Sequence, residues 1–437
     1  MFLHYLDLSW RSFRRTPLVS LLMVSAIAIG IGITMTSLSV YYMMAMDPIP
    51  HKSANLFQPQ LNTMDADRTW STPDDLPYQM TYKDAMHLHQ ANLPYRKSAS
   101  YRTGFSVHMN NADVKPFLEP ARVIGQDFFT MFEQQFIFGD AWSLEQEQGA
   151  SPLVVINRRI NDKLFGGDDS VGRSIYLDDT AYQIVGVVEN WETHIKYYDL
   201  NNGSFNSVEG IFIPITLTQS MQYDAWGNTN GWKFEEVNTY EDRLASELMW
   251  LQFWVQLDTP EAVQDFSQYL HAYLEQQGQL GRFERDNVEF ALRDVKEWLA
   301  YNNVVSEDNQ VLVGLSFMFL AVCLANILGL LLGKFLKRAP EVGVRRALGA
   351  SKRQVFYQHL VEVSVLGLIG GVLGIAIAQL GLWGVRATYS YYSALATMDV
   401  TMLLAAPIIA ISACVLAGLY PAWLVCRTTP AIYLKTQ

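Results

Sequence analysis

Four long runs without a charged residue constrain this chain more than any other feature of its sequence. The first, Leu18 to Met46, holds 29 residues without Asp, Glu, Lys, Arg or His, and similar runs span Val311–Gly333, Val363–Val385 and Val400–Cys426. A helix that crosses a bilayer needs about 20 apolar residues. We therefore expect four transmembrane helices, over residues 18–46, 311–333, 355–385 and 400–426, the third with a lead-in that carries His359 and Glu362.

The average composition of the chain hides these runs. A net charge of −11 and a mean hydropathy of +0.07 over 437 residues are typical of an acidic soluble protein. The composition excludes a disordered or collagen-like chain, and the acidity argues against a nucleic-acid partner. The apolar residues, however, are bunched rather than spread, so the averages describe neither part of the molecule.

The first run has an alternative interpretation as a cleaved signal peptide, because Arg11, Arg14 and Arg15 precede it. The apolar region of a signal peptide is about 7–15 residues long and ends at a small-x-small cleavage site. This run is longer and lacks such a site. An uncleaved membrane anchor is the favoured interpretation.

The distribution of Lys and Arg predicts the orientation of the helices, because basic residues concentrate in cytoplasmic segments. The segments 1–17, 334–354 and 427–437 together hold 12 basic and 2 acidic residues, whereas Met46–Gln310 holds 19 basic and 39 acidic residues. Both termini are therefore expected in the cytoplasm. Trp10 and Trp423 at the predicted inner ends agree, since Trp favours the bilayer interface.

These expectations define the fold class: an integral membrane α-helical protein with four transmembrane helices and a large external α+β domain between the first and second. The predicted parts besides the helices are a cytoplasmic amphipathic segment (1–17), the external domain (47–310), a cytoplasmic loop (334–354), an external loop (386–399) and a cytoplasmic tail (427–437).

Within the external domain, apolar alternation and turn residues predict a mixture of strands and helices. Expected strands are 151–157, 210–217, 248–257 and 288–292, with a hairpin of 173–177 and 181–188 around Asp178-Asp179. Expected helices are 158–165, a helix from Pro260 to Gln277 capped by Thr259, and 294–301, the last continuing directly into the second membrane helix. The segment 190–247 is rich in Asn, Gly and aromatic residues, and either grips a partner or packs locally.

The sequence contains no motif that indicates catalysis. The chain contains no GxxxxGK[ST], HExxH, GxSxG or CxxC motif. His87 and His89 could share a metal on a strand, but such a pair without a third ligand is mostly incidental. The pairs Asp168-Asp169 and Asp178-Asp179 lack EF-hand spacing and are interpreted as turn residues. We expect no catalytic residue, metal or cofactor in this chain.

The membrane runs also argue against a polar conduit, because only His359 and Glu362 are ionisable and both lie near the inner face. Small residues instead recur at a spacing of four: Ala325, Gly329 and Gly333 in the second helix, and Gly370, Gly374 and Ala378 in the third. Such stripes allow helices to approach closely, although glycine is also simply common in membrane helices. These stripes predict a closely packed, oligomeric bundle whose helices move as rods.

The cytoplasmic loop contains a predicted short helix from Pro340 to about Gly349. Proline suits the first helical position, Glu341 suits the positive end of the helix dipole, and Gly349 can end the helix. The helix is interpreted either as a docking element under the membrane or only as a positive-inside anchor.

At these residues the sequence resembles a family. Glu341–Ser351 (EVGVRRALGAS) and Leu366–Ala378 (LGLIGGVLGIAIA) resemble the FtsX-type permease signature of MacB-like ABC transporters. Tyr420-Pro421-Ala422-Trp423 with Arg427, Pro430 and Leu434 resembles the family's C-terminal motif, a Pro-Ala turn followed by Arg and Pro-x-x-x-Leu. Val123-Ile124-Gly125, Leu164-Phe165-Gly166 and Ile184–Val188 resemble the family's periplasmic core domain.

The resemblance implies a mechanism and partners. In the family, the loop helix is a coupling helix that seats in a separate ATPase subunit, which binds ATP and Mg²⁺, and the matching residues here are Glu341, Gly343, Arg345, Arg346 and Gly349. Other implied partners are a second permease copy or paralogue, membrane lipids and, in many members, a periplasmic adaptor with an outer-membrane channel.

The implied function is that of an inner-membrane permease subunit that converts ATP hydrolysis into motion of its periplasmic domain. The expected levers are the long first helix and the continuous helix into the second membrane run. Family members export or expel peptides, antibiotics or similar substrates. Two alternatives stay open, namely a subunit that extracts lipoproteins and a membrane-anchored periplasmic sensor or scaffold.

Overall fold

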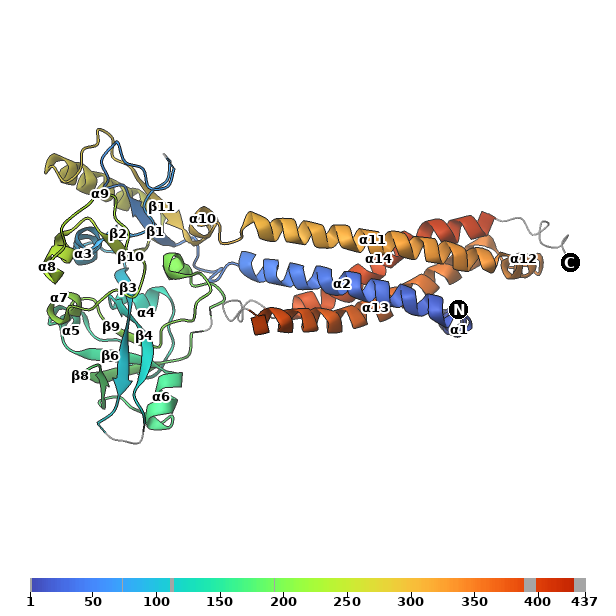
Figure 1. Cartoon of the computed structure of the whole chain (residues 1–437), viewed down its shortest axis with the longest axis horizontal. Coiled ribbons are helices and arrows are strands. Elements are labelled where there is room, and N and C mark those ends of the chain that lie inside the picture. Colours follow the sequence, from blue (N-terminus) through green and yellow to red (C-terminus); the bar gives the residue numbers. More distant parts are fainter. Residues whose placement is uncertain (1, 73, 111–113, 192, 389–397, 428–437) are drawn as a thin grey trace. The chain divides into compact units, whose positions relative to one another are not determined.

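The structure, a computed structural model, describes residues 2–72, 74–110, 114–191, 193–388 and 398–427 (Figure 1). The chain divides into two compact units, Met1–Met46 with Val305–Gln437, and Asp47–Val304. The second unit ends a few residues before the predicted domain boundary at 310. Each unit is described by itself.

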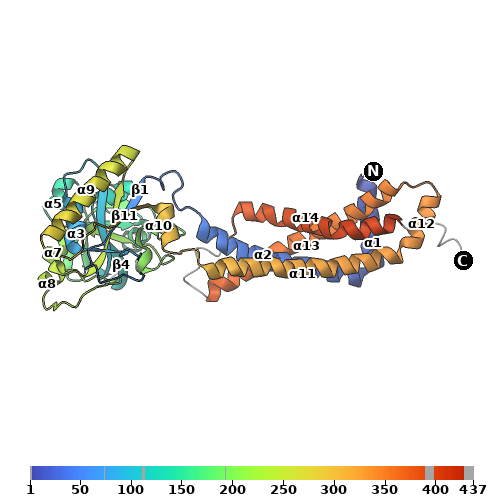
Figure 2. The ribbon, with the colours of Figure 1, turned by 90° about the horizontal axis from the view of Figure 1, so that it is seen from above.

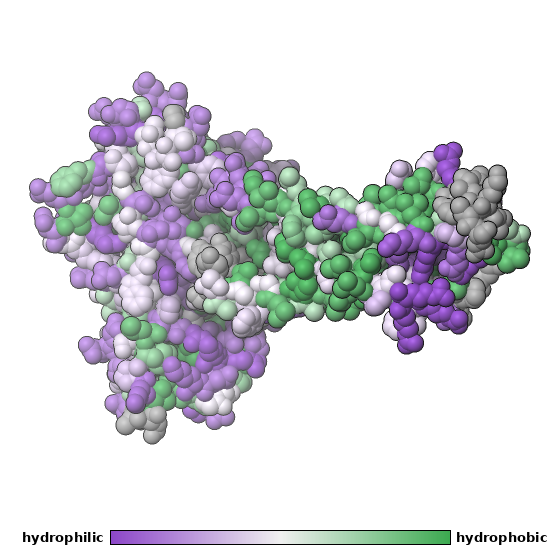
Figure 3. Space-filling model, turned by 45° about the vertical axis from the view of Figure 1, so that its right-hand side comes forward, coloured by the Kyte–Doolittle hydropathy of each residue, from purple (hydrophilic) through white to green (hydrophobic). Residues whose placement is uncertain are grey.

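All secondary-structure elements described in the first unit are helices (Figure 2). Its helices are α1 (Phe2–Arg15), α2 (Pro17–Ala45), α11 (Glu307–Lys337), α12 (Ala339–Ala347), α13 (Lys352–Thr388) and α14 (Val400–Arg427). Four of them, α2, α11, α13 and α14, are long and apolar enough to cross a membrane, as the sequence predicts. The space-filling view shows an apolar surface along these helices, with polar side chains gathered at the end that carries α12 (Figure 3).

Glycines bring α13 close to its neighbours in this bundle. A Cβ added at Gly370 would lie 2.4 Å from Cγ2 of Ile27, and one added at Gly374 would lie 2.8 Å from Cγ2 of Ile31, both on α2. Because real Cβ atoms do not approach so closely, these two glycines allow α2 and α13 to touch along their length.

The second predicted stripe behaves differently. A Cβ added at Gly329 or Gly333 of α11 would meet no described atom within 4 Å. The close approach predicted for these two glycines is therefore not made by any described helix of this chain. Sequence spacing alone could not separate the two stripes, because both have the same period of four.

The second unit is built on one mixed sheet with eleven described strands. Their order is β11-β1-β10-β3-β4-β9-β6-β8-β5, with β2 beside β10 and β7 beside β3 and β8. The strands are β1 (Leu56–Leu61), β2 (Met80–Thr81), β3 (Lys97–His108), β4 (Phe117–Ile124), β5 (Phe136–Gly139), β6 (Leu153–Asn157), β7 (Ser174–Leu177), β8 (Thr180–Val188), β9 (Ile211–Pro214), β10 (Met249–Gln256) and β11 (Phe290–Asp294). Two pairs, β4 with β9 and β6 with β8, are parallel.

Helices connect and cover this sheet. They are α3 (Tyr82–Gln90), α4 (Asp127–Met131), α5 (Leu144–Gln148), α6 (Arg158–Phe165), α7 (Leu217–Met221), α8 (Tyr240–Ala245), α9 (Pro260–Gln279) and α10 (Val295–Tyr301), with the 3₁₀ helix η1 (Tyr197–Asn202). The α+β class predicted for the external domain is confirmed.

Several local predictions are confirmed in detail. The strand β6 passes into α6, and β7 pairs antiparallel with β8 around Asp178, which has a left-handed φ of 51°. Thr259 caps α9 by accepting a hydrogen bond from the backbone N–H of Ala262 at 3.2 Å, and Pro260 is the first helical residue. These signals are local, so the sequence contains them completely.

Two of the predictions for the external domain are wrong. The helix α10 ends at Tyr301 and α11 begins at Glu307, so the continuous helix into the second membrane run does not exist. Asn303 in this break has a left-handed φ of 49°. His87 and His89 lie on the helix α3 and not on a strand. On a helix, residues two apart point in different directions, so the two rings do not face a common metal site.

The surroundings of these two histidines explain them without a metal. The His87 ring stacks on Tyr273 with centroids 4.3 Å apart. The Nε2 atom of His89 lies 2.9 Å from Oε1 of Glu147. Both are packing and hydrogen-bonding groups of the domain.

The aromatic segment 190–247 folds onto the domain through η1, β9, α7 and α8. Trp191 stacks on Tyr198 with centroids 4.6 Å apart, which confirms local packing for this tryptophan. Trp226 covers Gly104 yet stays 44% exposed, and Phe234 of the same segment is 92% exposed.

A buried charge cluster anchors the start of this segment. The side chains of Arg122, Lys196, Asp199 and Glu209 are all 0% exposed. An Nη1 atom of Arg122 donates to Oδ2 of Asp199 at 2.7 Å, and Lys196 donates to Glu209. Burial alone would raise the pKa of Asp199, but the neighbouring Arg122 and Lys196 lower it. The two cations and two carboxylates thus neutralise one another inside the domain.

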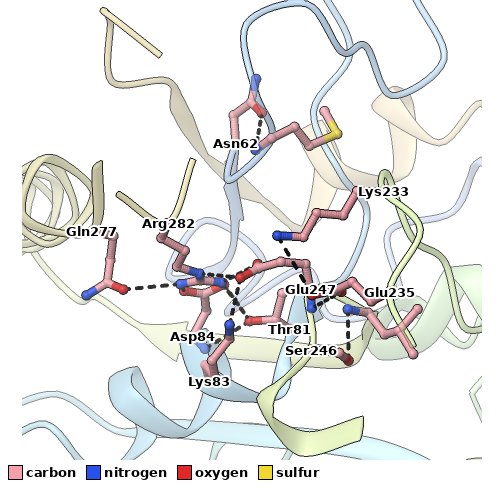
Figure 4. A network of polar contacts seen from close by, with 12 residues as sticks. Asn62, Thr81, Lys83, Asp84, Lys233, Glu235, Ser246, Glu247, Gln277 and Arg282 are labelled. Carbon is pink, nitrogen blue, oxygen red and sulfur yellow. Dashed lines mark hydrogen bonds and ion pairs between the residues drawn. The ribbon is translucent and has the colours of Figure 1, made fainter. Parts of the chain in front are cut away.

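A second buried cluster centres on Arg282, which follows α9 (Figure 4). Its Nη2 atom lies 2.6 Å from Oδ2 of Asp84 and 2.8 Å from Oε2 of Glu247. Thr81 and Tyr273 also donate to Asp84, at 2.6 and 2.7 Å. One guanidinium therefore joins the start of α3, the entry to β10 and the segment after α9.

We expect Gly374→Val to destabilise the helix bundle by about 1–3 kcal/mol, because the added atoms would overlap Ile31 of α2. Gly384→Val on the same helix is the matched control, since a Cβ there meets no described atom within 4 Å. Thermal unfolding of the detergent-solubilised protein measures both variants. Equal losses would contradict the assigned packing of α13 on α2.

We expect Arg282→Met to destabilise the external domain by about 3–5 kcal/mol, because two nearly buried carboxylates would lose their shared cation. Arg68→Met is the control, since Arg68 and its partner Asp67 are exposed. Circular dichroism during thermal unfolding of the full chain measures the difference. A loss no larger than that of the control would refute the central role of Arg282.

The same cluster predicts an acid dependence. Burial alone would raise the pKa of Asp84, but Arg282, Thr81 and Tyr273 outweigh burial and lower it. A carboxyl with a lowered folded pKa contributes stability above its unfolded pKa of about 3.9, and that contribution is lost as the pH falls towards the folded value. In the unfolding measurement, Asp84→Asn should flatten this acid-induced decline.

Candidate functional site

Four of the five predicted coupling residues lie on α12, a helix of nine residues after α11, and the fifth, Gly349, follows its end. Arg338 ends α11 and also precedes the first residue of α12, and Pro340 stands within the first turn as predicted. Gly349 has a φ of +104°, a backbone conformation that L side chains rarely adopt, so it ends the helix without strain. The predicted start and end of this helix are confirmed.

One side of α12 packs inward and the other is exposed. Ala339, Val342 and Gly343 are buried, whereas Val344 is 50% and Leu348 is 84% exposed. The exposed apolar pair at a spacing of four was not among the predicted site residues. The sequence contains a signal for this pair. An amphipathic helix needs only one apolar face to pack on its own chain, so apolar residues outside that face indicate a second contact surface.

Glu341 and Arg345 form an ion pair along the exposed edge of α12. Their Oε1 and Nη2 atoms are 2.7 Å apart, and Nη1 of Arg15 on α1 lies 3.6 Å from Oε2 of Glu341. Arg345 also donates to Gln358 of α13 at 3.3 Å. Because these side chains are about one-third or more exposed, the pairs position α12 more than they stabilise the bundle.

The hub below α12 is a buried carboxylate, Glu362 of α13. Its Oε1 lies 2.8 Å from Nζ of Lys334 on α11, and both side chains are 1% exposed. Ser12 of α1 donates to the same carboxylate, and Nη1 of Arg338 lies 3.7 Å from its other oxygen. Three helices thus meet at one side chain.

The sequence indicates Glu362 as a charge within a membrane run, but it does not indicate Lys334 as the partner. The lysine is the first residue after an apolar run, a position that by itself indicates only a positive-inside residue. Its pairing across helices depends on the tertiary arrangement. A buried carboxylate in a membrane helix requires a cation, which is the signal that could have indicated such a partner.

The C-terminal motif meets α12 at the end of α14. Nη1 of Arg346 donates to the carbonyl oxygen of Cys426 at 3.3 Å, and Arg427 lies over the ring of Trp423 at 4.3 Å. Pro421 and the buried Ala422 lie inside α14, which runs unbroken from Val400 to Arg427. The predicted Pro-Ala turn is therefore wrong, because the helix accommodates Pro421.

Other predicted site residues are placed as follows. Gly370 and Gly374 contact α2, whereas Gly329 and Gly333 face open space among the described residues. Pro430 lies outside the described residues. No group of three or more His, Cys, Asp or Glu residues that could hold a metal occurs in the described part of the chain.

Comparison with known proteins assigns this arrangement to a family. Residues 20–273 match the MacB-like periplasmic core domain, and residues 313–430 match the FtsX-like permease C-terminal domain. The chain belongs to the MacB-like family of FtsX-type ABC transporter permeases. With four helices able to span a membrane and this periplasmic domain between the first two, the permease is a multi-pass inner-membrane protein.

Individual relatives of the permease are distant. The uncharacterized ABC transporter permease YvrN of Bacillus subtilis is 23% identical over 58% of this chain and 55% of that protein. The macrolide export ATP-binding/permease protein MacB of Syntrophobacter fumaroxidans is 22% identical over 73% of this chain and 48% of that protein. The permease thus spans about half the length of the curated relatives it matches.

A solved structure of the periplasmic region of MacB from Actinobacillus actinomycetemcomitans is also similar. It covers 57% of this chain and 94% of its own, with a TM-score of 0.36 and 12% identity. The family assignment rests on the two domain matches.

We expect Glu362→Gln to destabilise the permease by about 3–5 kcal/mol, because the buried ammonium of Lys334 would lose its counter-charge. The double variant Lys334→Met/Glu362→Met removes both charges and should recover most of that loss. Glu341→Gln, in a half-exposed pair, should cost less than about 1 kcal/mol. Thermal unfolding in detergent measures the stability of each variant. A double variant that is no more stable than Glu362→Gln would contradict the assigned pair.

Proposed function

We propose that this chain is the permease subunit of an ATP-driven exporter and that α12 transmits the motion of a separate ATPase subunit. The observation that carries the proposal is the exposed face of α12, backed by the buried hub at Glu362 that ties α1, α11 and α13 together. A force applied to α12 would reach three helices at once. The sequence has no phosphate-binding loop, so ATP and Mg²⁺ are assigned to the partner.

The properties of the bundle support transmission of motion rather than passage of a substrate between its helices. The charged residues described in α11 and α13 lie near the helix ends, and the middles carry none. The contacts of Gly370 and Gly374 hold α13 closely against α2. Closely packed, uncharged helices favour movement as rods, which agrees with work done on the periplasmic side.

The names of relatives support export as the task. Besides MacB of Syntrophobacter fumaroxidans, named for macrolide export, the matches include the pyoverdine export ATP-binding/permease protein PvdT of Pseudomonas savastanoi. We propose a small antibiotic, peptide or similar periplasmic compound as substrate. These names favour export over lipoprotein extraction and over a membrane-anchored sensor.

The proposed assembly contains two permeases and two ATPase subunits. The exposed glycine face of α11, with Gly329 and Gly333, agrees with a helix that meets another chain, since nothing described in this chain covers it. A periplasmic adaptor and an outer-membrane channel complete the proposal for an exporter that crosses both membranes.

We expect Arg345→Glu/Arg346→Glu to reduce co-purification of the ATPase with the permease at least tenfold, because both positive charges of the α12 edge would be reversed. Val344→Ser/Leu348→Ser should weaken it too, and this variant changes only exposed side chains. The charge-matched control Arg14→Glu/Arg353→Glu should leave the complex intact.

Pull-down of the ATPase from detergent extracts, followed by ATPase activity of the eluate, measures the effect. If no ATPase accompanies the wild-type permease, the assignment as a transporter subunit fails. If the ATPase accompanies all variants equally, α12 is not the coupling helix.

A further inference from the structure

A pocket opens between α1, α12 and the beginning of α13. Its cavity volume is about 130 Å³. A water molecule occupies about 30 Å³ in the liquid, so the pocket has room for roughly four water-sized groups. That space has room for a phosphate group.

The charges around this pocket are predominantly positive. Arg11 and Arg15 line it from α1, Arg338 and Arg345 line it from the α12 side, and Glu341 is the only carboxylate among its described lining residues. Glu341 lies 2.7 Å from Arg345 and 3.6 Å from Arg15. Four guanidinium groups therefore share one lining carboxylate.

Two of these arginines have a further carboxylate nearby. Arg11 lies 2.9 Å from the exposed Asp7, and Arg338 lies 3.7 Å from Glu362, which Lys334 already neutralises. Including Asp7, Glu362 and Lys334, cations still exceed anions around the pocket. An incoming anion would therefore find guanidinium donors that are incompletely used.

A buried histidine adds an independent sign of a missing partner. His359 lines the pocket, is 2% exposed, and neither of its ring nitrogens has a hydrogen-bond partner among the described residues. Its Nδ1 lies 3.8 Å from Glu362, which is too long for a hydrogen bond. Buried polar atoms normally find a partner, so a ligand or its hydration water is expected here.

We propose that this pocket binds the phosphate group of an anionic lipid from the inner leaflet. The planar guanidinium of arginine matches phosphate oxygens in two-point hydrogen bonds, which explains a site built from arginines. Basic pockets between membrane helices on the cytoplasmic side are suited to lipid headgroups. The proposal does not depend on the ATPase.

The surroundings of α1 favour a lipid over free phosphate as the source. Leu8 lines the same pocket, and Trp10 of α1 is 55% exposed with Arg14 5.6 Å from its ring. An exposed tryptophan beside basic residues is typical of a helix at the bilayer interface. A bound phosphate would join α1 to α12, as the pair of Arg15 and Glu341 does in part.

The test uses the full-length protein and phosphatidylglycerol as probe. Native mass spectrometry of the detergent-solubilised protein, titrated with phosphatidylglycerol or phosphatidylcholine, counts bound lipids for each variant. Arg11→Gln/Arg15→Gln should bind phosphatidylglycerol about tenfold more weakly, because two charge-assisted hydrogen-bonding groups are lost. The matched control Arg14→Gln/Arg353→Gln also removes two arginines, but neither lines the pocket.

Folding is controlled by a charge-preserving variant. Arg11→Lys/Arg15→Lys keeps both charges but loses the two-point hydrogen bonds, so its affinity should lie between those of the wild type and Arg11→Gln/Arg15→Gln. All variants are compared by thermal unfolding without lipid. Competition by inorganic phosphate separates the two sources. Phosphate that displaces the lipid at micromolar concentration would support the same site with free phosphate as its ligand.

Three results would overturn the proposal. Equal weakening in the pocket and control variants would indicate only a general attraction of the basic face. Equal binding of phosphatidylcholine and phosphatidylglycerol would exclude recognition of an anionic headgroup. Unchanged lipid binding with lost ATPase co-purification in Arg11→Gln/Arg15→Gln would make the pocket an ATPase contact.

Discussion

The buried pair of Glu362 and Lys334 is the interaction on which the cytoplasmic end of this permease depends. A carboxylate removed from water is costly unless cations and donors surround it, and Glu362 obtains them from α1 and α11. The need to satisfy this one charge therefore fixes three helices relative to one another. Because α12 follows α11 directly through Arg338, α12 rests on the same three helices.

The rest of the bundle needs no charge to hold together. Gly370 and Gly374 remove the side-chain atoms that would keep α13 from α2, and dispersion contacts with Ile27 and Ile31 follow. A polar hub at one end and tight apolar contacts along the helices form a body that resists bending. Such a body suits the proposed role, in which displacement of α12 moves the helices as units.

The external domain uses the same solution to buried charge twice. Arg282 holds Asp84 and Glu247, while Arg122 and Lys196 hold Asp199 and Glu209. In both clusters, segments far apart in the sequence meet because each buried charge must find a partner. The cluster of Arg122, Lys196, Asp199 and Glu209 anchors the start of the aromatic segment after residue 190 on the domain, an arrangement that the composition of the segment left open.

The sequence by itself determined the membrane helices, the orientation, the α+β class and the ends of short elements such as α12, because these follow from local composition and turn chemistry. Only the tertiary structure decided which glycine stripe packs within the chain and that Lys334 is the partner of Glu362. It also showed that the helix breaks between α10 and α11 and that Pro421 lies inside the continuous helix α14. These depend on contacts between distant residues, whose energies no local pattern encodes.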